Sequence, residues 1–538
     1  MTGRPLGALL GGAALISALT VAARAAGFAR WAVFAPAVGS TAIGSAYTAA
    51  NALPNVLFEV AAGGALAGLV VPLAAGPLAR KAAGEVNAIA SALMTWTLTV
   101  LVPLAAVLAL AAGPIARAIL GGAVESAHPG SQAAAAQLLV MFAPQVPLYG
   151  IGVVAAGLLQ AGKRFFWPAL APLASSVAVI AVYAVFAGLA GGRQDSPLTL
   201  SGGALAWLGW GTTAGVAVLT LPLLAPLRRQ GVRWRWSYRW PEGLGRRALA
   251  LAGSGLGALA AQQLCVVAVV LLANRRGGTG TLPLYHYAQA VYMLPYAVLA
   301  LPLATAAFPY LAQAASGDDP TRLRCLSSRT SRLVLAAGLA GAAALMAAAP
   351  AVQRVFAAID RSGGAAGLAG AVVWFAPGLA GFALLTHLQR LLYSAGQARA
   401  GGIAVAVGWL SAVAACVTWV TIVTSDHPDS VATLRALGGG SSLGMVVGAL
   451  VAVAAVGRSL GAGMLAGLGR TALLGGAGAA IGALFGNRLA GAVADSATWS
   501  ALAVGIAAAL IAAAVVAVLA LSDSGLRDDL KWLKGLER

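Results

Sequence analysis

Long apolar runs separated by short polar connections fill most of this sequence. Most of the runs exceed the ~20 residues that a helix needs to cross the hydrocarbon core of a bilayer. The pattern predicts an all-α polytopic membrane protein with about fourteen transmembrane helices. The predicted segments lie near residues 7–36, 40–76, 86–113, 133–160, 165–190, 203–226, 247–274, 284–314, 333–357, 366–393, 401–423, 439–457, 471–486 and 497–521.

The cationic residues are distributed unevenly between the two sides of these helices. If the N-terminus is cytoplasmic, 23 of the 34 Lys and Arg residues lie in cytoplasmic connections and 8 lie on the opposite side. An excess of Lys and Arg is typical of cytoplasmic loops. The distribution therefore predicts a multi-pass protein of the inner (plasma) membrane whose N- and C-termini are both cytoplasmic.

The composition excludes an ordinary soluble protein. The chain is 60% hydrophobic and only 9% charged, whereas soluble domains carry roughly 25% charged residues. A cleavable signal peptide is the alternative for the N-terminus, because Arg4 precedes an apolar run and Ala23-Arg24-Ala25. The length of that run favours a retained first helix. Three widely spaced cysteines indicate neither a disulfide framework nor a metal site.

A basic and aromatic connector, residues 228–246, divides the predicted helices into two sets. It contains the sequence RWRWSYRW from Arg233 to Trp240. Interleaved cations and aromatic rings can stack on nucleic-acid bases, or can lie at headgroup depth on an anionic membrane surface. The membrane interpretation is favoured in a chain of this composition, so no nucleic-acid partner is expected.

Two local matches indicate an internal repeat. Leu53-Pro54 resembles Leu294-Pro295, and Ala161-Gly162 at a helix end resembles Ala395-Gly396. Six helices in each set give the copies the same orientation, as parallel repeats require. The sequence therefore predicts two six-helix lobes with a central cavity between them. The predicted parts are an N-terminal lobe (1–227), the connector (228–246), a C-terminal lobe (247–458), a C-terminal helix pair (459–521) and a cytoplasmic tail (522–538).

Signatures of common enzymes are missing from the sequence. It contains no phosphate-binding loop, zinc-protease motif or serine-hydrolase elbow. Transport is therefore favoured over catalysis, and no catalytic residue, cofactor or metal site is predicted.

Charged residues within the apolar segments are the most informative candidates for function. Arg24 and Arg30 lie in the first segment and Glu59 in the second. A charge that faces lipid costs roughly 2.5–3.5 kcal/mol on insertion scales, so these residues should face a wet cavity or one another. Pairing of Glu59 with Arg24 is the structural alternative. Two guanidinium groups match phosphate oxygens bidentately, which favours a phosphorylated or otherwise anionic substrate.

Uncharged polar residues extend this candidate site. Tyr47, Asn51, Asn55 and Glu59 recur every four residues, which places them on one slowly drifting face of a helix. Such a polar stripe faces protein or water. The predicted substrate-binding residues are Arg24, Arg30, Asn51, Asn55, Glu59, Gln262, Gln289 and Tyr292.

Four motifs in a characteristic order resemble one known family. They run from Ala23 to Arg30, from Leu53-Pro54-Asn55 to Val70-Val71-Pro72, from Gly162-Lys163-Arg164 to Ala171-Pro172, and from Tyr287-Ala288 to Phe308-Pro309. Together they resemble the lipid II flippase family (MurJ, also called MviN) of the multidrug, oligosaccharidyl-lipid and polysaccharide exporter superfamily. The stretch from Asn51 to Glu59 looks like the branch found in high-GC Gram-positive bacteria.

This resemblance implies a function and roles for individual residues. The substrate would be lipid II, an undecaprenyl-pyrophosphate-linked peptidoglycan precursor, moved from the inner to the outer leaflet by alternating access for cell-wall synthesis. Arg24 and Arg30 match family arginines that engage the diphosphate. Phe58 and Glu59 stand where many members carry an Arg pair, and Ala290 where they carry an Arg. These departures leave fewer cationic side chains in the expected cavity. Cell-wall synthesis proteins are further candidate partners.

Other functions stay open at this point. Within transport, the substrate could be another polyprenyl-linked glycan or a small molecule exported by the same superfamily. From a different class, the chain could be a membrane-embedded glycosyltransferase or a scaffold for cell-wall enzymes. Glu59 is the only acidic residue in the predicted helices, so no carboxylate relay for proton or sodium coupling is evident.

Overall fold

The computed structural model describes residues 4–240, 256–317, 319–424, 427–492, 498–523 and 525–529. Part of the predicted connector, the first residues of the predicted segment 247–274 and the end of the predicted tail lie outside these ranges. Within them the chain is helical and forms no strand. It divides into an N-terminal unit, Met1–Leu259, and a C-terminal unit, Ala260–Arg538.

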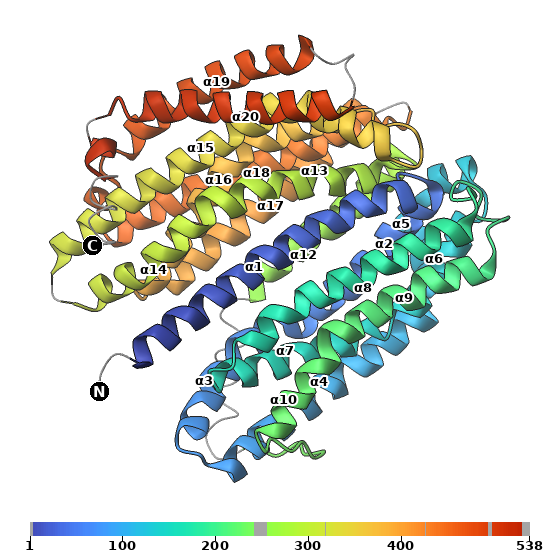
Figure 1. The fold of residues 1–538 in the computed structure, drawn as a ribbon, viewed down its shortest axis with the longest axis horizontal. Helices are drawn as coiled ribbons and strands as arrows, with labels where there is room; N and C mark the ends of the chain where they lie inside the picture. Colours follow the sequence, from blue (N-terminus) through green and yellow to red (C-terminus); the bar gives the residue numbers. More distant parts are fainter. Residues whose placement is uncertain are drawn as a thin grey trace. The chain divides into compact units, whose positions relative to one another are not determined.

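The N-terminal unit is a bundle in which neighbouring helices pack along much of their length. α1 packs on α8 and α8 on α9, while α3 and α4 pack on α7 and α2 packs on α6 (Figure 1). Its elements are α1 (Arg4–Ala37), α2 (Ala42–Phe58), η1 (Glu59–Gly63), α3 (Gly64–Ala79), α4 (Ala83–Leu110), α5 (Ala112–Ala127), α6 (Ser131–Phe142), α7 (Gln145–Ala161), α8 (Phe166–Ala190), α9 (Gly202–Thr220), η2 (Leu221–Leu223) and α10 (Leu224–Arg229).

The later helices build the C-terminal unit around α15, α16 and α18. α16 packs on both α15 and α18, and α17 packs on α18. The last two helices, α19 and α20, lie alongside α15 (Figure 1). The elements are α12 (Leu256–Leu272), η3 (Ala273–Gly277), α13 (Thr281–Pro295), η4 (Tyr296–Ala300), α14 (Leu301–Ser316), α15 (Pro320–Ile359), α16 (Leu368–Ser394), α17 (Ala398–Val423), α18 (Ser430–Ser459), η5 (Ala462–Leu465), α19 (Leu468–Ala492) and α20 (Thr498–Ala520).

The predicted class, an all-α polytopic membrane protein, is confirmed. Among the described residues, twelve helices are long and apolar enough to cross a membrane, and a shorter apolar helix covers Leu69–Ala79. These twelve helices follow the order of the third to fourteenth segments predicted from the sequence. α1 and the continuous run from α2 to α3 correspond to the first two predicted segments.

Two helices begin well before the apolar segments that predict them. α15 starts at Pro320, whereas the apolar run starts near residue 333, because the carboxylate of Asp319 accepts hydrogen bonds from the backbone N–H groups of Thr321 and Arg322. Asp429 caps α18 in the same way through the N–H of Ala432. These polar caps extend each helix beyond its apolar part, so hydropathy alone places the start too late.

Matching π-helical turns interrupt one helix in each unit. In the N-terminal unit, η1 (Glu59–Gly63) follows Pro54 and leads into α3. In the C-terminal unit, η4 (Tyr296–Ala300) directly follows Pro295 and leads into α14. Proline supplies no N–H to the helical ladder, and π-turns of this kind often mark functional segments. The repeated Leu-Pro motif therefore coincides with a repeated break in helix geometry.

The segment after α20 is anchored to α15 by ion pairs. Asp529 accepts from the Arg332 guanidinium, with Nη2 2.7 Å from Oδ2 and 2.9 Å from Oδ1, and Arg329 Nε lies 3.4 Å from Oδ1. Burial raises the pKa of the Asp529 carboxyl, and the two arginines lower it. These contacts hold residues 525–529 against the C-terminal unit.

Candidate functional site

The turn between α1 and α2 sets the position of the candidate residues in the N-terminal unit. Gly39 takes a left-handed conformation at φ 76°, and Thr41 caps α2 by accepting from the N–H of Gly44. The loop after α8 holds both helices, because Gln194 Nε2 donates to Ala37 O at 3.0 Å and Asp195 Oδ1 accepts from Ala42 N at 2.9 Å. The start of α2 is therefore fixed to the end of α1.

A buried cluster of hydroxyl groups lies just below this turn. The Tyr47 hydroxyl is 2.8 Å from that of Tyr183 and 3.1 Å from Thr212 Oγ1. Phe34 of α1 packs against both tyrosine rings at centroid distances of 5.7 and 5.3 Å. Tyr47, the first member of the polar stripe, thus faces protein and fixes α2 against α8 and α9.

Both predicted cationic residues lie on α1. Arg24 is exposed and Arg30 is partly exposed. Arg30 lies close enough to the hydroxyls of Tyr47, Tyr149 and Tyr183 for an electrostatic interaction with each. Its guanidinium carbon is also 6.0 Å from the Trp31 ring centroid, within cation–π range. Arg30 therefore sits at the accessible edge of the hydroxyl cluster.

The polar stripe on α2 becomes more accessible toward η1. Asn51 is half-buried, Asn55 is exposed and Glu59 is half-buried. Asn55 donates to Asn51 O at 3.3 Å, and its side chain lies near the Tyr149 hydroxyl. The Asn51 Oδ1 atom is buried and has no hydrogen-bond partner in the described part of the chain. A buried acceptor without a partner is costly, so a donor that reached this oxygen would stabilise it.

Pairing of Glu59 with Arg24, the structural alternative, is not observed. In the ranges that the structure describes, the ion pairs of Asp and Glu with Lys and Arg do not include Glu59. Glu59 begins the π-turn, and its backbone N–H donates to the carbonyls of Asn55 and Val56. Arg24 and Glu59 are therefore not neutralised by one another.

The remaining predicted residues belong to the C-terminal unit. Gln262 on α12 and Gln289 on α13 are half-buried, whereas Tyr292 on α13 is buried. The Tyr292 ring contacts Phe375 of α16 at a centroid distance of 5.4 Å. Within this unit, Tyr292 is a packing residue with its ring against α16, and the two glutamines present accessible amide groups.

Sequence reasoning missed Tyr149 as a member of the site. This tyrosine lies on α7, has its hydroxyl near the Asn55 side chain and packs on Phe58 at 5.6 Å between ring centroids. Its only sequence signal is Gln145-Val146-Pro147-Leu148-Tyr149, a polar and aromatic start to an otherwise apolar helix. A search for clustered polar residues within a single helix cannot find a partner that a different helix supplies.

The described residues contain no group of three His, Cys, Asp or Glu side chains that could hold a metal ion. The site instead offers guanidinium groups, amides and phenol hydroxyls. These are hydrogen-bond donors suited to an anionic, oxygen-rich ligand.

Together, the apolar helices, the two helical units and the breaks in α2–α3 and α13–α14 define a polytopic α-helical membrane protein. A family model described as "Lipid II flippase MurJ" matches residues 34–468. This chain belongs to the lipid II flippase MurJ family. Members are described as flippases, which agrees with the non-enzymatic class that the sequence predicts.

Curated relatives share moderate sequence identity with the chain. A "Probable lipid II flippase MurJ" from Rhizobium meliloti (strain 1021) is 25% identical over 338 residues, which are 62% of this chain and 60% of the relative. A "Lipid II flippase MurJ" from Burkholderia cenocepacia is 27% identical over 312 residues, or 56% of each chain. The matched region thus spans between 56% and 60% of the length of these two relatives.

Solved structures share the fold at lower identity. A structure titled "Lipid II flippase MurJ, inward closed conformation" superposes with a TM-score of 0.69 and 16% identity, covering 93% of this chain and 98% of that one. An inward-facing multidrug resistance MATE family transporter of the MOP superfamily gives a TM-score of 0.62 at 15% identity, covering 85% and 94%. These two similarities establish the fold.

Proposed function

We propose that this protein is a flippase that moves lipid II, the lipid-linked peptidoglycan precursor, from the inner to the outer leaflet of the bacterial plasma membrane. Membership of the MurJ family carries this proposal. Arg24 and Arg30 on α1 support it, and Arg30 lies beside the cluster of buried hydroxyl groups. Neither arginine has a carboxylate partner among the described residues.

Arg24 and Arg30 are proposed to bind the diphosphate. A guanidinium donates two parallel hydrogen bonds to phosphate oxygens, and the strength of such a pair rises as water is excluded. Arg30 lies six positions after Arg24, a rise of about 9 Å and an offset of about 120° around α1, so the two long side chains would approach a diphosphate from different sides. Asn51 and Asn55 add amide donors on α2. Glu59 would repel a fully ionised diphosphate, which sets it at the edge of the anion site.

Gln262 and Gln289 are proposed to contact the sugar and peptide part of the substrate, with the buried Tyr292 in a supporting position through its packing on Phe375. Amide groups donate to and accept from hydroxyl and peptide groups, and accessible glutamines can adapt to both. Transport by alternating access then requires only that the charged headgroup is bound while the chain changes conformation. Neutralisation of the diphosphate by Arg24 and Arg30 lowers the cost of carrying it past the apolar core.

The proposed orientation places both termini in the cytoplasm. It rests on the excess of Lys and Arg in the connections of that side. Cell-wall synthesis enzymes that consume the flipped precursor are the proposed protein partners, because a polymerase must use the precursor after the flippase has moved it.

Binding of lipid II to purified variants tests this function. Arg24→Gln should weaken binding roughly tenfold or more, since one charge-assisted bidentate contact is lost. Arg117→Gln is the matched control, because Arg117 is also exposed but lies on α5. Undiminished lipid II binding by Arg24→Gln would contradict the proposed site.

Depletion in cells tests the reaction separately. Lipid II should accumulate in the inner leaflet while polymerase activity in membranes stays normal. Accumulation in both leaflets would point to a glycosyltransferase or scaffold instead.

A further inference from the structure

The connector after α10 forms an extended strap along α4. We use "strap" for residues 232–240, which have no helical or strand structure of their own. Backbone N–H groups of Arg233, Arg235 and Ser237 donate to side chains of α4, and the acceptors are Asn87 Oδ1 at 2.8 Å, Ser91 Oγ at 3.0 Å and Thr95 Oγ1 at 3.0 Å. The sequence predicted a surface connector but gave no sign of this contact.

The two periodicities match along the contact. Four residues of an α-helix rise about 6 Å, and two residues of an extended chain rise about 6.6 Å. Alternate N–H groups of the strap therefore meet side chains at every fourth position of α4. Tyr238 ends the contact, because its carbonyl accepts from Trp96 Nε1 at 3.3 Å and its hydroxyl lies 3.1 Å from Thr99 Oγ1.

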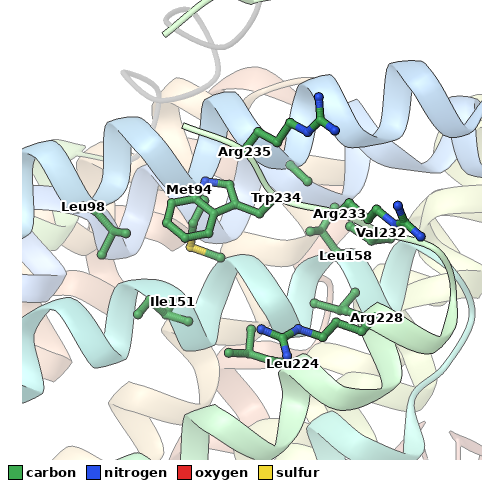
Figure 2. A pocket seen from close by; sticks show the side chains of 12 residues that line it. Met94, Leu98, Ile151, Leu158, Leu224, Arg228, Val232, Arg233, Trp234 and Arg235 are labelled. Carbon is green, nitrogen blue, oxygen red and sulfur yellow. The ribbon is translucent and has the colours of Figure 1, made fainter. Parts of the chain in front are cut away.

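Beneath the strap lies a largely apolar cavity of about 570 Å³. Its walls come from α4, α7, α10 and the strap itself. Figure 2 shows the Trp234 ring beside Met94, with Leu98 and Ile151 on the two facing helices. The volume lies within the range of sites for small ligands, about 300–1,000 Å³. Walls made of Met, Leu, Ile and Ala side chains favour a hydrocarbon chain.

Three arginines border this apolar cavity. They are Arg228 at the end of α10, and Arg233 and Arg235 of the strap (Figure 2). All three are exposed. In the part of the chain that the structure describes, none of them has an acidic partner within ion-pair distance. An apolar cavity with an unneutralised cationic rim is complementary to an amphiphile with an anionic headgroup.

An aromatic row runs beside the arginines. Trp234 and Trp236 have ring centroids 6.1 Å apart, and Trp236 and Tyr238 have centroids 6.0 Å apart. All three side chains are about half exposed, at 47%, 57% and 46%. Trp and Tyr in membrane proteins favour the depth of the lipid headgroups, and basic pockets between membrane helices bind lipid headgroups.

From these observations we infer that the strap forms a binding site for an anionic glycerophospholipid. Arg228, Arg233 and Arg235 hold its phosphate, and one acyl chain occupies the cavity between α4 and α7. The site lies within the N-terminal unit and shares no residue with the proposed lipid II site, so it does not depend on the transported substrate. A bound lipid fills the space under the strap and holds the connector against α4.

Native mass spectrometry of the full-length protein tests this site with phosphatidylglycerol and phosphatidylcholine. Phosphatidylglycerol should bind more tightly to the unmodified protein. The double variant Arg233→Gln/Arg235→Gln should weaken it roughly fivefold for each charge removed. The matched control is Arg229→Gln/Arg239→Gln, which removes the same charge nearby from residues that do not line the cavity. The control should retain binding.

Two further measurements separate the chain from the headgroup. Leu98→Trp fills the cavity without changing charge, so it should weaken phosphatidylglycerol binding. Size-exclusion chromatography should show that this variant and the arginine variants are all folded. Glycerophosphoglycerol, which is the phosphodiester headgroup of phosphatidylglycerol without its acyl chains, should not compete. Equal weakening by both arginine pairs, or full competition by glycerophosphoglycerol, would overturn the proposed site.

Discussion

Tyr47 of α2 and Tyr183 of α8 share a hydrogen bond of 2.8 Å between hydroxyl groups that are buried in the N-terminal unit. Thr212 of α9 completes the cluster at 3.1 Å from the Tyr47 hydroxyl. One side chain therefore connects three helices that are far apart in sequence. The same helix, α2, carries the polar stripe of the proposed site, so this hydrogen bond is one of the contacts that fix the position of the stripe.

Removal of the Tyr47 hydroxyl should destabilise the N-terminal unit. Tyr47→Phe leaves the Tyr183 hydroxyl buried without this partner, at a cost of about 1–3 kcal/mol. Thermal unfolding in detergent would show the loss as a lower Tm. Tyr393→Phe is the control, because Tyr393 is 43% exposed and should change Tm little. The double variant Tyr47→Phe/Tyr183→Phe should cost less than the sum of the single variants, and strict additivity would contradict the coupling.

The sequence predicts the membrane class and the order of the segments, since these depend on apolar runs, which act locally. It also identifies the repeated Leu-Pro motif, but the π-turns that follow each copy appear only in the structure. The start of α15 was placed too late, because a polar cap at Asp319 precedes the apolar run. Partners such as Tyr149, and the acceptors Ser91 and Thr95 on α4, could not be found in advance. They come from other helices, and only the tertiary packing brings them to Asn55 and to the strap.

Geometry as well as charge should matter at Arg30. Arg30→Lys keeps a positive charge but loses the planar fork that binds two phosphate oxygens. We expect lipid II affinity roughly tenfold below that of the unmodified protein, and a larger loss in Arg30→Gln. Titration of purified protein would rank the three forms. Arg117→Lys should bind normally. Equal affinity of Arg30→Lys and the unmodified protein would show that charge alone suffices.

The strap should loosen when its acceptors on α4 are removed. Ser91→Ala/Thr95→Val deletes the oxygens that accept from Arg235 and Ser237, at about 1 kcal/mol for each hydrogen bond. Hydrogen exchange in a peptide covering residues 232–240 should become faster, while exchange in α8 stays unchanged. Thr421→Val is the control, because that hydroxyl donates only to carbonyls of its own helix, those of Val417 and Thr418. Unchanged exchange in the double variant would show that these hydrogen bonds do not hold the strap.

Close packing between α17 and α18 depends on glycines at every fourth position of α18. Gly440, Gly444 and Gly448 face α17, and a β-carbon at Gly444 would lie 2.6 Å from both the Ala412 N and Gly408 O atoms. Small residues at this spacing let the backbones of membrane helices approach closely. Because backbone atoms cannot move aside cheaply, Gly444→Ala should destabilise the C-terminal unit by about 1–3 kcal/mol.

The matched substitution lies on the partner helix. A β-carbon at Gly402 of α17 would meet no atom within 4 Å. Alanine also has the higher helix propensity, so Gly402→Ala should be neutral or stabilising by up to about 1 kcal/mol. Thermal unfolding should therefore show a lower Tm for Gly444→Ala and a higher or unchanged Tm for Gly402→Ala. If both lower Tm equally, the cost would come from helix backbone effects in general, and the proposed close contact between α17 and α18 would be wrong.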